Sequence, residues 1–299
     1  MAKKRRKLRE AAKELSEFQL QQTEDIDFSL KEDELFGPGM EKRPSLLFLG
    51  YYSKEGLELA LKKYGIYKAF EKRGFGNLQL LLDTQDPYRQ RLALYSVIEK
   101  INARLLLAEI VARRKHVQFD PPFEYPLAGR SFEMLYIEWL SMQDPRKKFT
   151  AERPRLPGQN YPGLGGGKIA LELVVLACRR LRLAGVLNVP EYFHNAQMYS
   201  RAFQFIDPEK EGRRRAIKRD LLSKNSLATV SWAIDLNCVR ENGKAFKWFI
   251  GEQLIPVNAQ LKDYFRAPEY SSLVKEAQER YRYTLDEGRW EKKKKRIPG

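Results

Sequence analysis

The chain has 299 residues, of which 43% are hydrophobic and 12% aromatic, and it carries a formal net charge of +16. This composition excludes an intrinsically disordered chain and allows a sizeable core. No apolar run reaches the roughly 18 residues that a membrane-spanning helix needs. Two cysteines and two histidines give no metal-ligand cluster, so we expect no metal site. The basic N-terminus lacks the apolar stretch of a secretory signal, and we expect a cytoplasmic, reducing compartment.

The first half of the chain predicts an extension followed by alternating helices and strands. Residues 1–43 are expected to form a charged, flexible N-terminal extension. The hydrophobic pattern then predicts these elements in order: a helix over 55–73, strands over 77–83 and 90–95, a helix over 97–114, and a strand over 131–140.

The second half continues the alternation. The pattern predicts, in order, a helix over 166–184 with Gly185 as its C-cap, a strand over 186–190, and helices over 194–203, 209–222 and 225–242. We therefore expect an α/β fold, a mixed twisted sheet flanked by helices. The main domain is expected over 44–265, and a helical, basic C-terminal extension over 266–299.

The most specific chemical signal is the glycine loop, residues 156–168, with the sequence LPGQNYPGLGGGK. It lies between a predicted strand and a predicted helix. Glycine lets a ligand approach the backbone, and the first N–H groups of a helix have no partner within the helix. This arrangement favours a phosphate or pyrophosphate. The alternative is a simple turn, because glycine turns before helices are common.

Other motifs with known chemistry are missing from the chain. The loop does not end in Gly-Lys-Ser/Thr, which argues against a nucleotide P-loop. No Gly-x-Ser-x-Gly sequence indicates an α/β-hydrolase, and the strict dinucleotide fingerprint is absent.

Residues 131–206 resemble the cofactor-binding half of the GNAT superfamily of acyl-CoA-dependent N-acyltransferases. The resemblance lies in the order strand, Gln159-Asn-Tyr-Pro-Gly-Leu-Gly165 loop, helix, strand, and the segment His194-Asn-Ala-Gln-Met-Tyr199-Ser-Arg-Ala-Phe203. It implies a GNAT-like fold, a CoA thioester such as acetyl-CoA or another acyl-CoA, and direct acyl transfer to an amine. The resemblance leaves the acceptor amine and the acyl chain length open.

The resemblance assigns a set of cofactor-binding residues whose loop amides would hold the CoA pyrophosphate. They are Gln159, Asn160, Gly163, Leu164, Gly165, Gly166, Gly167, Lys168 and Asn195. Asn195 is expected either to cap its helix or to bond a pantetheine amide. Lys168 would add positive charge near the phosphates.

Three residues are candidates for proton transfer. Glu138 interrupts an apolar strand, and a partly buried carboxylate there would have a raised pKa and accept a proton from the amine. His194 is the alternative base. Tyr199 would protonate the leaving thiolate. For each of them an ordinary structural role is the competing interpretation: an exposed glutamate, a histidine bonded to a carbonyl, or a core tyrosine.

The positive charge is concentrated in three blocks, and these favour a second hypothesis. Arg213, Arg214, Arg215, Lys218 and Arg219 form one block, and the two basic termini, including 292–296, form the others. Such blocks suit a polyanion. The alternative function is therefore a non-catalytic GNAT-like scaffold that binds nucleic acid or a ribonucleoprotein. A third reading is an interaction protein with an inert core, whose tails recruit partners.

Overall fold

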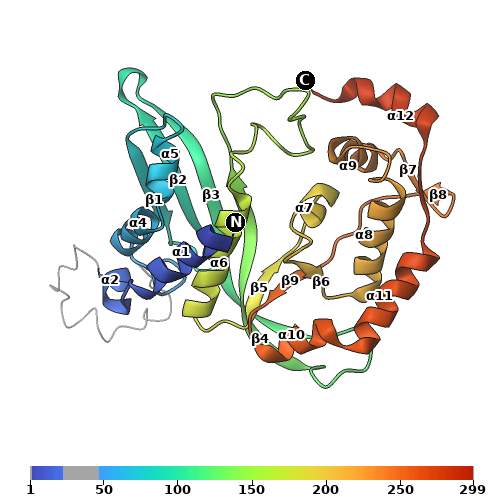
Figure 1. Ribbon diagram of the computed structural model, residues 1–299, viewed down its shortest axis with the longest axis horizontal. Helices are drawn as coiled ribbons and strands as arrows, with labels where there is room; N and C mark the ends of the chain where they lie inside the picture. The colour runs from blue at the N-terminus through green and yellow to red at the C-terminus, as the bar shows by residue number, and fades with distance from the viewer. Residues whose placement is uncertain (1, 23–46, 299) are drawn as a thin grey trace. The chain divides into compact units, whose positions relative to one another are not determined.

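The computed structural model describes residues 2–22 and 47–298 (Figure 1). The chain forms two compact units. Unit 1 comprises Met1–Arg114, Tyr136–Pro145 and Gly163–Leu181, and unit 2 comprises the remaining residues. Residues 23–43 of the expected N-terminal extension lie outside the described residues.

A seven-stranded sheet has the order β1-β2-β3-β4-β5-β9-β6. Its strands are β1 (Leu78–Asp83), β2 (Gln90–Ile98), β3 (Ala103–Phe119), β4 (Arg130–Met142), β5 (Gly185–Asn188), β6 (Gln204–Phe205) and β9 (Gln253–Pro256). The pairs β1–β2, β2–β3, β5–β9 and β6–β9 are antiparallel. The expectation of a mixed α/β fold with helices flanking a sheet is confirmed.

Unit 1 combines the first strands of this sheet with helices. The helices are α1 (Ala2–Lys13), α2 (Glu17–Gln21), α4 (Lys54–Lys63), α5 (Ile66–Glu71) and α6 (Gly167–Arg180). Phe70 of α5 and the adjacent Phe75 are each 1% exposed, and they join Leu80, Leu94 and Leu107 of the strands in one core cluster. This burial of apolar side chains holds α5 on the sheet.

The N-terminal helix α1 is docked on α6 within unit 1. Leu8 and Leu15 are buried. The carboxylate of Glu172 in α6 forms ion pairs with Arg9 Nη2 at 3.0 Å and with Arg5 Nε at 3.3 Å. Arg180 donates to the carbonyl of Leu15 at 2.8 Å. Although its sequence is strongly basic, α1 is therefore attached to unit 1 by both apolar and ionic contacts.

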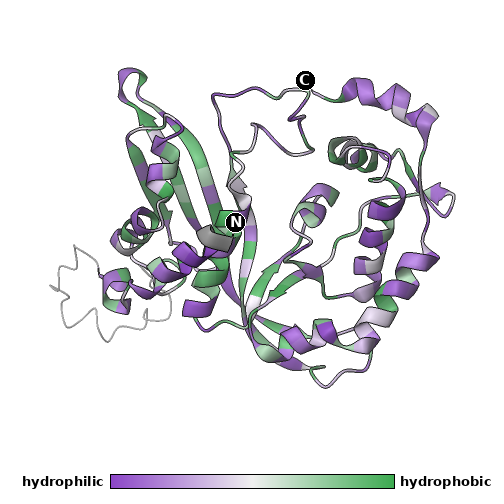
Figure 2. Ribbon diagram, viewed as in Figure 1, coloured by the Kyte–Doolittle hydropathy of each residue, from purple (hydrophilic) through white to green (hydrophobic). Residues whose placement is uncertain are grey.

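Unit 2 contains most of the helices of the second half of the chain. They are α7 (Phe193–Met198), α8 (Pro208–Asp220), α9 (Leu227–Asp235), α10 (Ala259–Arg266), α11 (Pro268–Arg280) and α12 (Glu287–Lys293). A second sheet has the order β10-β7-β8, with β10 (Tyr283–Leu285), β7 (Val239–Glu241) and β8 (Lys244–Ala245). Figure 2 shows that β5 and β9 are mostly apolar and that α12 is hydrophilic.

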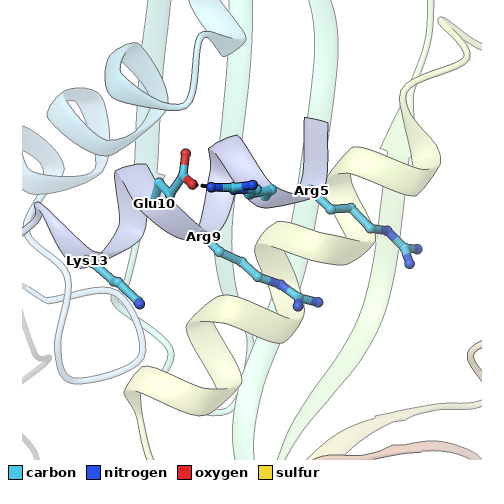
Figure 3. A pocket seen from close by; sticks show the side chains of 5 residues that line it. Arg5, Arg9, Glu10 and Lys13 are labelled. Carbon is cyan, nitrogen blue, oxygen red and sulfur yellow. Dashed lines mark hydrogen bonds and ion pairs between the residues drawn. The ribbon is translucent and has the colours of Figure 1, made fainter. Parts of the chain in front are cut away.

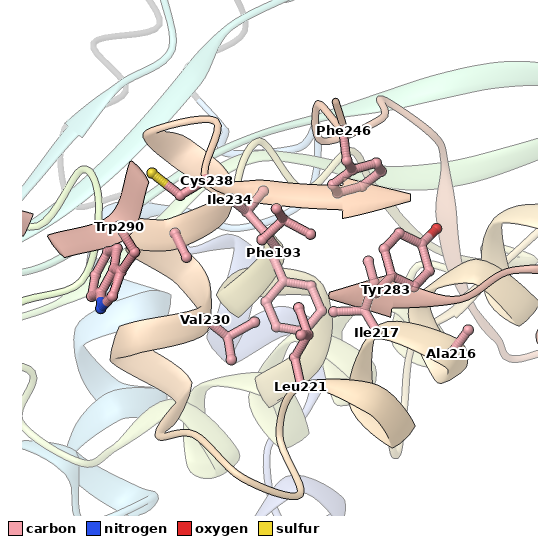
Figure 4. Close-up of a cluster of buried hydrophobic side chains, with 12 residues drawn as sticks. Phe193, Ala216, Ile217, Leu221, Val230, Ile234, Cys238, Phe246, Tyr283 and Trp290 are labelled. Carbon is pink, nitrogen blue, oxygen red and sulfur yellow. The ribbon is translucent and has the colours of Figure 1, made fainter. Parts of the chain in front are cut away.

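The core of unit 2 brings α7, α8, α9 and the small sheet together (Figure 4). Phe193, Ile217, Ile234 and Phe246 are each at most 4% exposed. Trp290 of α12 joins the same cluster, so α12 is anchored by one aromatic side chain. No helix among residues 2–22 and 47–298 has the length and apolar content to cross a membrane.

The helix predicted over 97–114 is wrong, because this segment is mostly strand β3. Residues 105–112 are almost continuously apolar, and such a run fits a buried strand as well as a helix. Tertiary pairing makes this segment a strand, since β3 pairs with β2 in antiparallel register from Gln90↔Ala112 to Ile98↔Ala103.

Helix ends also differ from the prediction. The helix expected over 55–73 is divided by Gly65, whose φ of 70° starts α5. Gly185 is not a C-cap, because it begins β5, and Arg182 adopts the left-handed φ of 56° after α6. The helix expected to reach residue 242 ends at Asp235, and Asn237 (φ 54°) turns the chain into β7.

The contact between α8 and α11 predicts a sensitive position at Gly212. A Cβ there would lie 2.5 Å from the Cβ of Ala277 and 2.5 Å from the carbonyl oxygen of Val274. We expect Gly212→Ala to lower the free energy of unfolding by about 1–3 kcal/mol in urea denaturation, because the helices must move apart.

Gly288→Ala in α12 is the matched control. Its Cβ would meet no atom closer than Asp286 Oδ1 at 4.0 Å. The helix propensity of alanine should then raise stability by up to about 1 kcal/mol. Equal effects of the two substitutions would contradict the packing argument.

Candidate functional site

The residues assigned from the sequence divide between the two units. Unit 1 contains Glu138, Gly163, Leu164, Gly165, Gly166, Gly167 and Lys168. Unit 2 contains Gln159, Asn160, His194, Asn195 and Tyr199. Each group is described within its own unit.

In unit 1, the end of the glycine loop is packed against the last residue of β4. The amide of Leu164 donates to the carbonyl of Met142 at 3.2 Å, so this amide is already used within the protein. The Leu164 side chain is 8% exposed and belongs to the core cluster of unit 1. At Gly166 a Cβ would lie 2.5 Å from Met142 Cε. Protein packing therefore explains a small residue at 166.

Gly163 differs from its neighbours because the protein itself does not require a glycine there. Its φ is outside the left-handed region, and a Cβ would meet nothing closer than the Met142 carbonyl oxygen at 3.7 Å, an ordinary contact. The residue is exposed. Gly163 also forms an isolated antiparallel bridge with Gln143, and the space around it would accommodate a Cβ.

The loop leads into the N-terminus of α6, which no side chain caps. Gly166 is the N-cap residue without a side-chain hydrogen bond, and the amides of Ile169 and Ala170 bond to its carbonyl. The first turn contains no acidic residue, and Lys168 there is exposed. The first turn of α6 therefore contributes no carboxylate of its own to neutralise the positive end of the helix dipole.

Arg73 is a further basic residue at this loop, and the sequence analysis missed it. It follows α5, and its Nη2 donates to the carbonyl of Leu164 at 3.2 Å. No motif marks Arg73, since only the tertiary packing of α5 brings it to the loop.

Glu138, the proposed base in unit 1, is exposed. Its side chain is 38% exposed, and Glu138 Oε1 lies 3.2 Å from Arg89 Nε. The expectation of a partly buried carboxylate is therefore wrong. Both faces of β4 are buried at Met134, Leu135 and Ile137, and the strand becomes exposed at Glu138 and Trp139.

In unit 2, Gln159 is used to close its own turn. Gln159 Oε1 accepts from the amide of Leu156 at 3.2 Å, and its carbonyl accepts from Arg155 Nε at 2.7 Å. Asn160 is exposed. Of these two residues, only Asn160 presents its side chain to solvent.

His194 is deeply buried in α7. It is 2% exposed, and its ring stacks on Tyr192 with centroids 5.5 Å apart. Burial lowers the pKa of His194 to about 4, so the imidazole is neutral at physiological pH. Its Nδ1 has no hydrogen-bond partner among the described residues. The expected bond from this histidine to a carbonyl is thus not made through Nδ1.

Asn195 does not cap α7. The N-cap residue is Tyr192, without a side-chain bond, and Asn195 lies inside the helix. Tyr199 is the C-cap residue and is partly buried. Burial raises the pKa of Tyr199, which keeps the phenol protonated at neutral pH.

The basic block on α8 is largely engaged inside unit 2. Arg214 is buried, 2.5 Å from Glu211 Oε1, and donates to Gln197 Oε1 at 2.7 Å. Arg213 forms an ion pair with Glu241 at 2.5 Å, and Arg219 forms one with Asp220 at 2.6 Å. Arg215 Nε lies 2.9 Å from Glu211 Oε1, whereas Lys218 is exposed. Most of this positive charge is therefore balanced within the fold.

A shallow hollow of about 510 Å³ lies along α1 (Figure 3). Its lining is Arg5, Arg6, Arg9, Glu10 and Lys13. Arg5 and Arg9 extend to Glu172 of α6, and Arg6 pairs with Glu10 at 2.8 Å. The hollow is basic, and its arginines are already paired with carboxylates.

Comparison with known proteins gives no assignment: no family model matches the chain, and no curated protein matches it. The functional argument therefore depends on the residues themselves.

The buried neutral His194 predicts an acid-sensitive stability. The pKa is about 6.5 in the unfolded chain and about 4 in the folded protein, so stability is present above pH ~6.5 and falls as the pH falls toward ~4. In urea denaturation, we expect a loss of about 2 kcal/mol between about pH 7 and about pH 5 from this residue alone.

His194→Phe should remove that part of the pH dependence, because phenylalanine keeps an aromatic ring and cannot titrate. His116→Gln is the control at an exposed histidine. If His194→Phe leaves the difference between the two pH values unchanged, the neutral buried imidazole is not its source.

Proposed function

We propose that the protein is an acyl-CoA-dependent N-acyltransferase, with acetyl-CoA or another acyl-CoA as the acyl donor. The observation that carries the proposal is Gly163, an exposed glycine whose φ and surroundings would also allow a larger residue. It precedes Gly166, the N-cap of a 14-residue helix that no side chain caps. A pyrophosphate is a group that needs close backbone approach and benefits from the helix dipole.

The charge around the loop supports an anionic ligand. Arg73 and Lys168 place two cations at the loop, and the first turn of α6 has no acidic residue. We assign pyrophosphate contacts to the backbone at Gly163, Gly165 and Gly167 and to these two cations. The Leu164 amide is not among the proposed phosphate ligands, because its N–H already donates to the Met142 carbonyl.

The order of elements agrees with the order that carried the GNAT resemblance. Strand β4 precedes the glycine loop, and the loop is followed by α6, β5 and α7. β4 and β5 are neighbours in the sheet and are connected through a helix, the connection that parallel neighbours use. This agreement supports the family proposal at the level of architecture.

Proton transfer is assigned to Glu138 and Tyr199. Glu138 is exposed and receives the proton from the attacking amine, whereas His194 is too deeply buried to reach an amine directly. The bound thioester supplies the acyl group. Tyr199, kept protonated by burial, gives its proton to the departing thiolate. No covalent enzyme intermediate is needed.

The nucleic-acid scaffold remains the second candidate. Lys292, Lys295 and Arg296 near the C-terminus are exposed and favour polyanion binding, whereas the α8 block is mostly balanced internally. The two cysteines are free and buried, in agreement with the proposed cytoplasmic location.

The proposal is tested by thermal unfolding with CoA and with acetyl-CoA at moderate salt. A ligand at about 100 times its dissociation constant should stabilise the folded state by about 2.7 kcal/mol. Gly163→Ala should abolish this shift, because the methyl group fits the protein but occupies the space of the phosphate.

Gly76→Ala is the matched control, since its Cβ would meet no atom within 4 Å and its φ is not left-handed. A shift retained in Gly163→Ala, or absent from the wild type, would contradict the cofactor loop. Binding to single-stranded RNA with a steep salt dependence would then favour the scaffold function.

A further inference from the structure

Unit 2 contains a basic segment that the sequence analysis did not single out, residues 146–155, which lie directly before the glycine loop. Its sequence is RKKFTAERPR, with five basic residues and one acidic residue. Lys148 and Arg153 are exposed, and neither forms an ion pair with a carboxylate of the described residues. In this respect the segment differs from the block on α8, whose arginines are mostly paired with carboxylates.

The end of this segment is attached to α9. Trp232 Nε1 of α9 donates to the carbonyl of Arg155 at 2.7 Å. The side chain of Arg155 is held as well, since its Nε donates to the carbonyl of Gln159 at 2.7 Å and its guanidinium lies 5.6 Å from the centre of the Phe149 ring. The basic segment therefore has a defined place on unit 2.

The basic C-terminal residues are attached to the same helix. Lys293 Nζ donates at 2.7 Å to the carbonyl of Leu236, the C-cap residue of α9. Trp290 of α12 belongs to the core cluster that contains Val230 and Ile234 of α9 (Figure 4). Three exposed cations surround this anchored lysine in the sequence, and none of them forms an ion pair with a carboxylate of the described residues: Lys292, Lys295 and Arg296.

The two attachment points lie close together on α9. Trp232 and Leu236 are four residues apart, so they lie one helical turn from each other on the same face. Arg155 and Lys293, which are far apart in the sequence, thus meet at the C-terminal end of one helix. The exposed cations of both segments gather around this end, and we call them the α9 basic surface: Lys148, Arg153, Lys292, Lys295 and Arg296.

We propose that the α9 basic surface binds the phosphate backbone of a single-stranded nucleic acid. Exposed cations without carboxylate partners can replace the counterions of a phosphate backbone, and the release of these counterions favours binding. Tyr161 lies two residues after Gln159, and its ring is 42% exposed. An exposed aromatic ring near cations offers a stacking surface to an unpaired base, which favours a single strand over a duplex.

This inference lies within unit 2 and does not depend on the binding of acyl-CoA. It rests on the second candidate function, nucleic-acid binding, and it names the surface that would carry it. The surface adds the segment 146–155 to the C-terminal block, and it leaves out the internally balanced block on α8.

An anionic membrane fits the α9 basic surface less well. Surfaces that lie on a membrane commonly add apolar side chains that enter the region below the headgroups. The large apolar side chains of these two segments, Phe149 and Ile297, are partly buried, and Ile297 packs against the core cluster of unit 2.

The test measures the anisotropy of a fluorescent oligouridine of about 20 nucleotides with the full chain, between about 50 and 200 mM NaCl. Each lost phosphate contact should reduce the slope of log K against log salt concentration by about 0.7. We therefore expect Lys148→Gln with Arg153→Gln to reduce it by about 1.4 and to weaken binding about tenfold. Lys292→Gln with Lys295→Gln should have the same effect, and all four substitutions together should reduce the slope by about 2.8.

Lys7→Gln with Lys13→Gln is the matched control, since it removes the same charge from exposed lysines of α1 in unit 1. It should leave the slope unchanged. An equal loss in this control would show that net charge alone governs binding, and it would overturn the proposal. Binding that survives the four substitutions, or that the wild type lacks, also overturns it. An oligothymidine of the same length distinguishes DNA from RNA, and tighter binding of either strand supports the surface.

Two further measurements separate the alternatives. Sedimentation with vesicles of equal parts phosphatidylserine and phosphatidylcholine tests the membrane, and vesicle binding without oligonucleotide binding overturns the proposal. The thermal shift with acetyl-CoA is recorded for the variant with all four substitutions, none of which lies in the glycine loop. Loss of oligonucleotide binding with an unchanged thermal shift supports the surface, and oligonucleotide binding by a wild type that shows no thermal shift supports it even where the acyltransferase proposal fails.

Discussion

The contact between the end of β4 and the glycine loop is the constraint on which the candidate site depends. The Met142 carbonyl accepts a hydrogen bond from the Leu164 amide. The Met142 side chain occupies the space where a Cβ of residue 166 would lie. Leu164 is drawn into the core of unit 1, so the loop cannot slide along the strand. Because the loop is held from the protein side at residues 164 and 166, the open position at Gly163 and the uncapped start of α6 are presented in a fixed geometry. For the proposed pyrophosphate site, such preorganisation would reduce the conformational entropy lost on binding.

Burial controls the protonation of both titratable candidates of α7. The same apolar surroundings lower the pKa of His194 and raise that of Tyr199, since each shift favours the uncharged form. The neutral form has a different consequence for proton transfer at each residue. A protonated tyrosine retains a proton that it can donate, whereas the imidazole of His194 is too deeply buried to reach an amine directly. The burial of α7 therefore favours an acid at Tyr199 and argues against a base at His194.

The sequence predicts the central elements well because their signals are local. The alternation at 131–140, the glycines at 163–167 and the periodic run after them indicate strand, loop and helix in the observed order. Residues 97–114 are different, because an unbroken apolar run has no period, and only pairing with β2 makes it a strand. The basic block on α8 misleads for a related reason. Two of its partners, Glu241 and Gln197, are distant in sequence and cannot be read from the run, whereas Glu211 and Asp220 lie within it.

The polar residues of β5 and β9 show the limit of sequence reasoning about the core. A glutamine before Leu-Ile-Pro and an asparagine after Gly-Val-Leu carry no motif, and their pairing exists only in the register of the sheet. A satisfied core would place apolar side chains in this row, since replacing an unpaired buried amide with an apolar group of similar shape removes a desolvation cost. Asn188 and Gln253, in register on neighbouring strands, therefore lower stability rather than raise it.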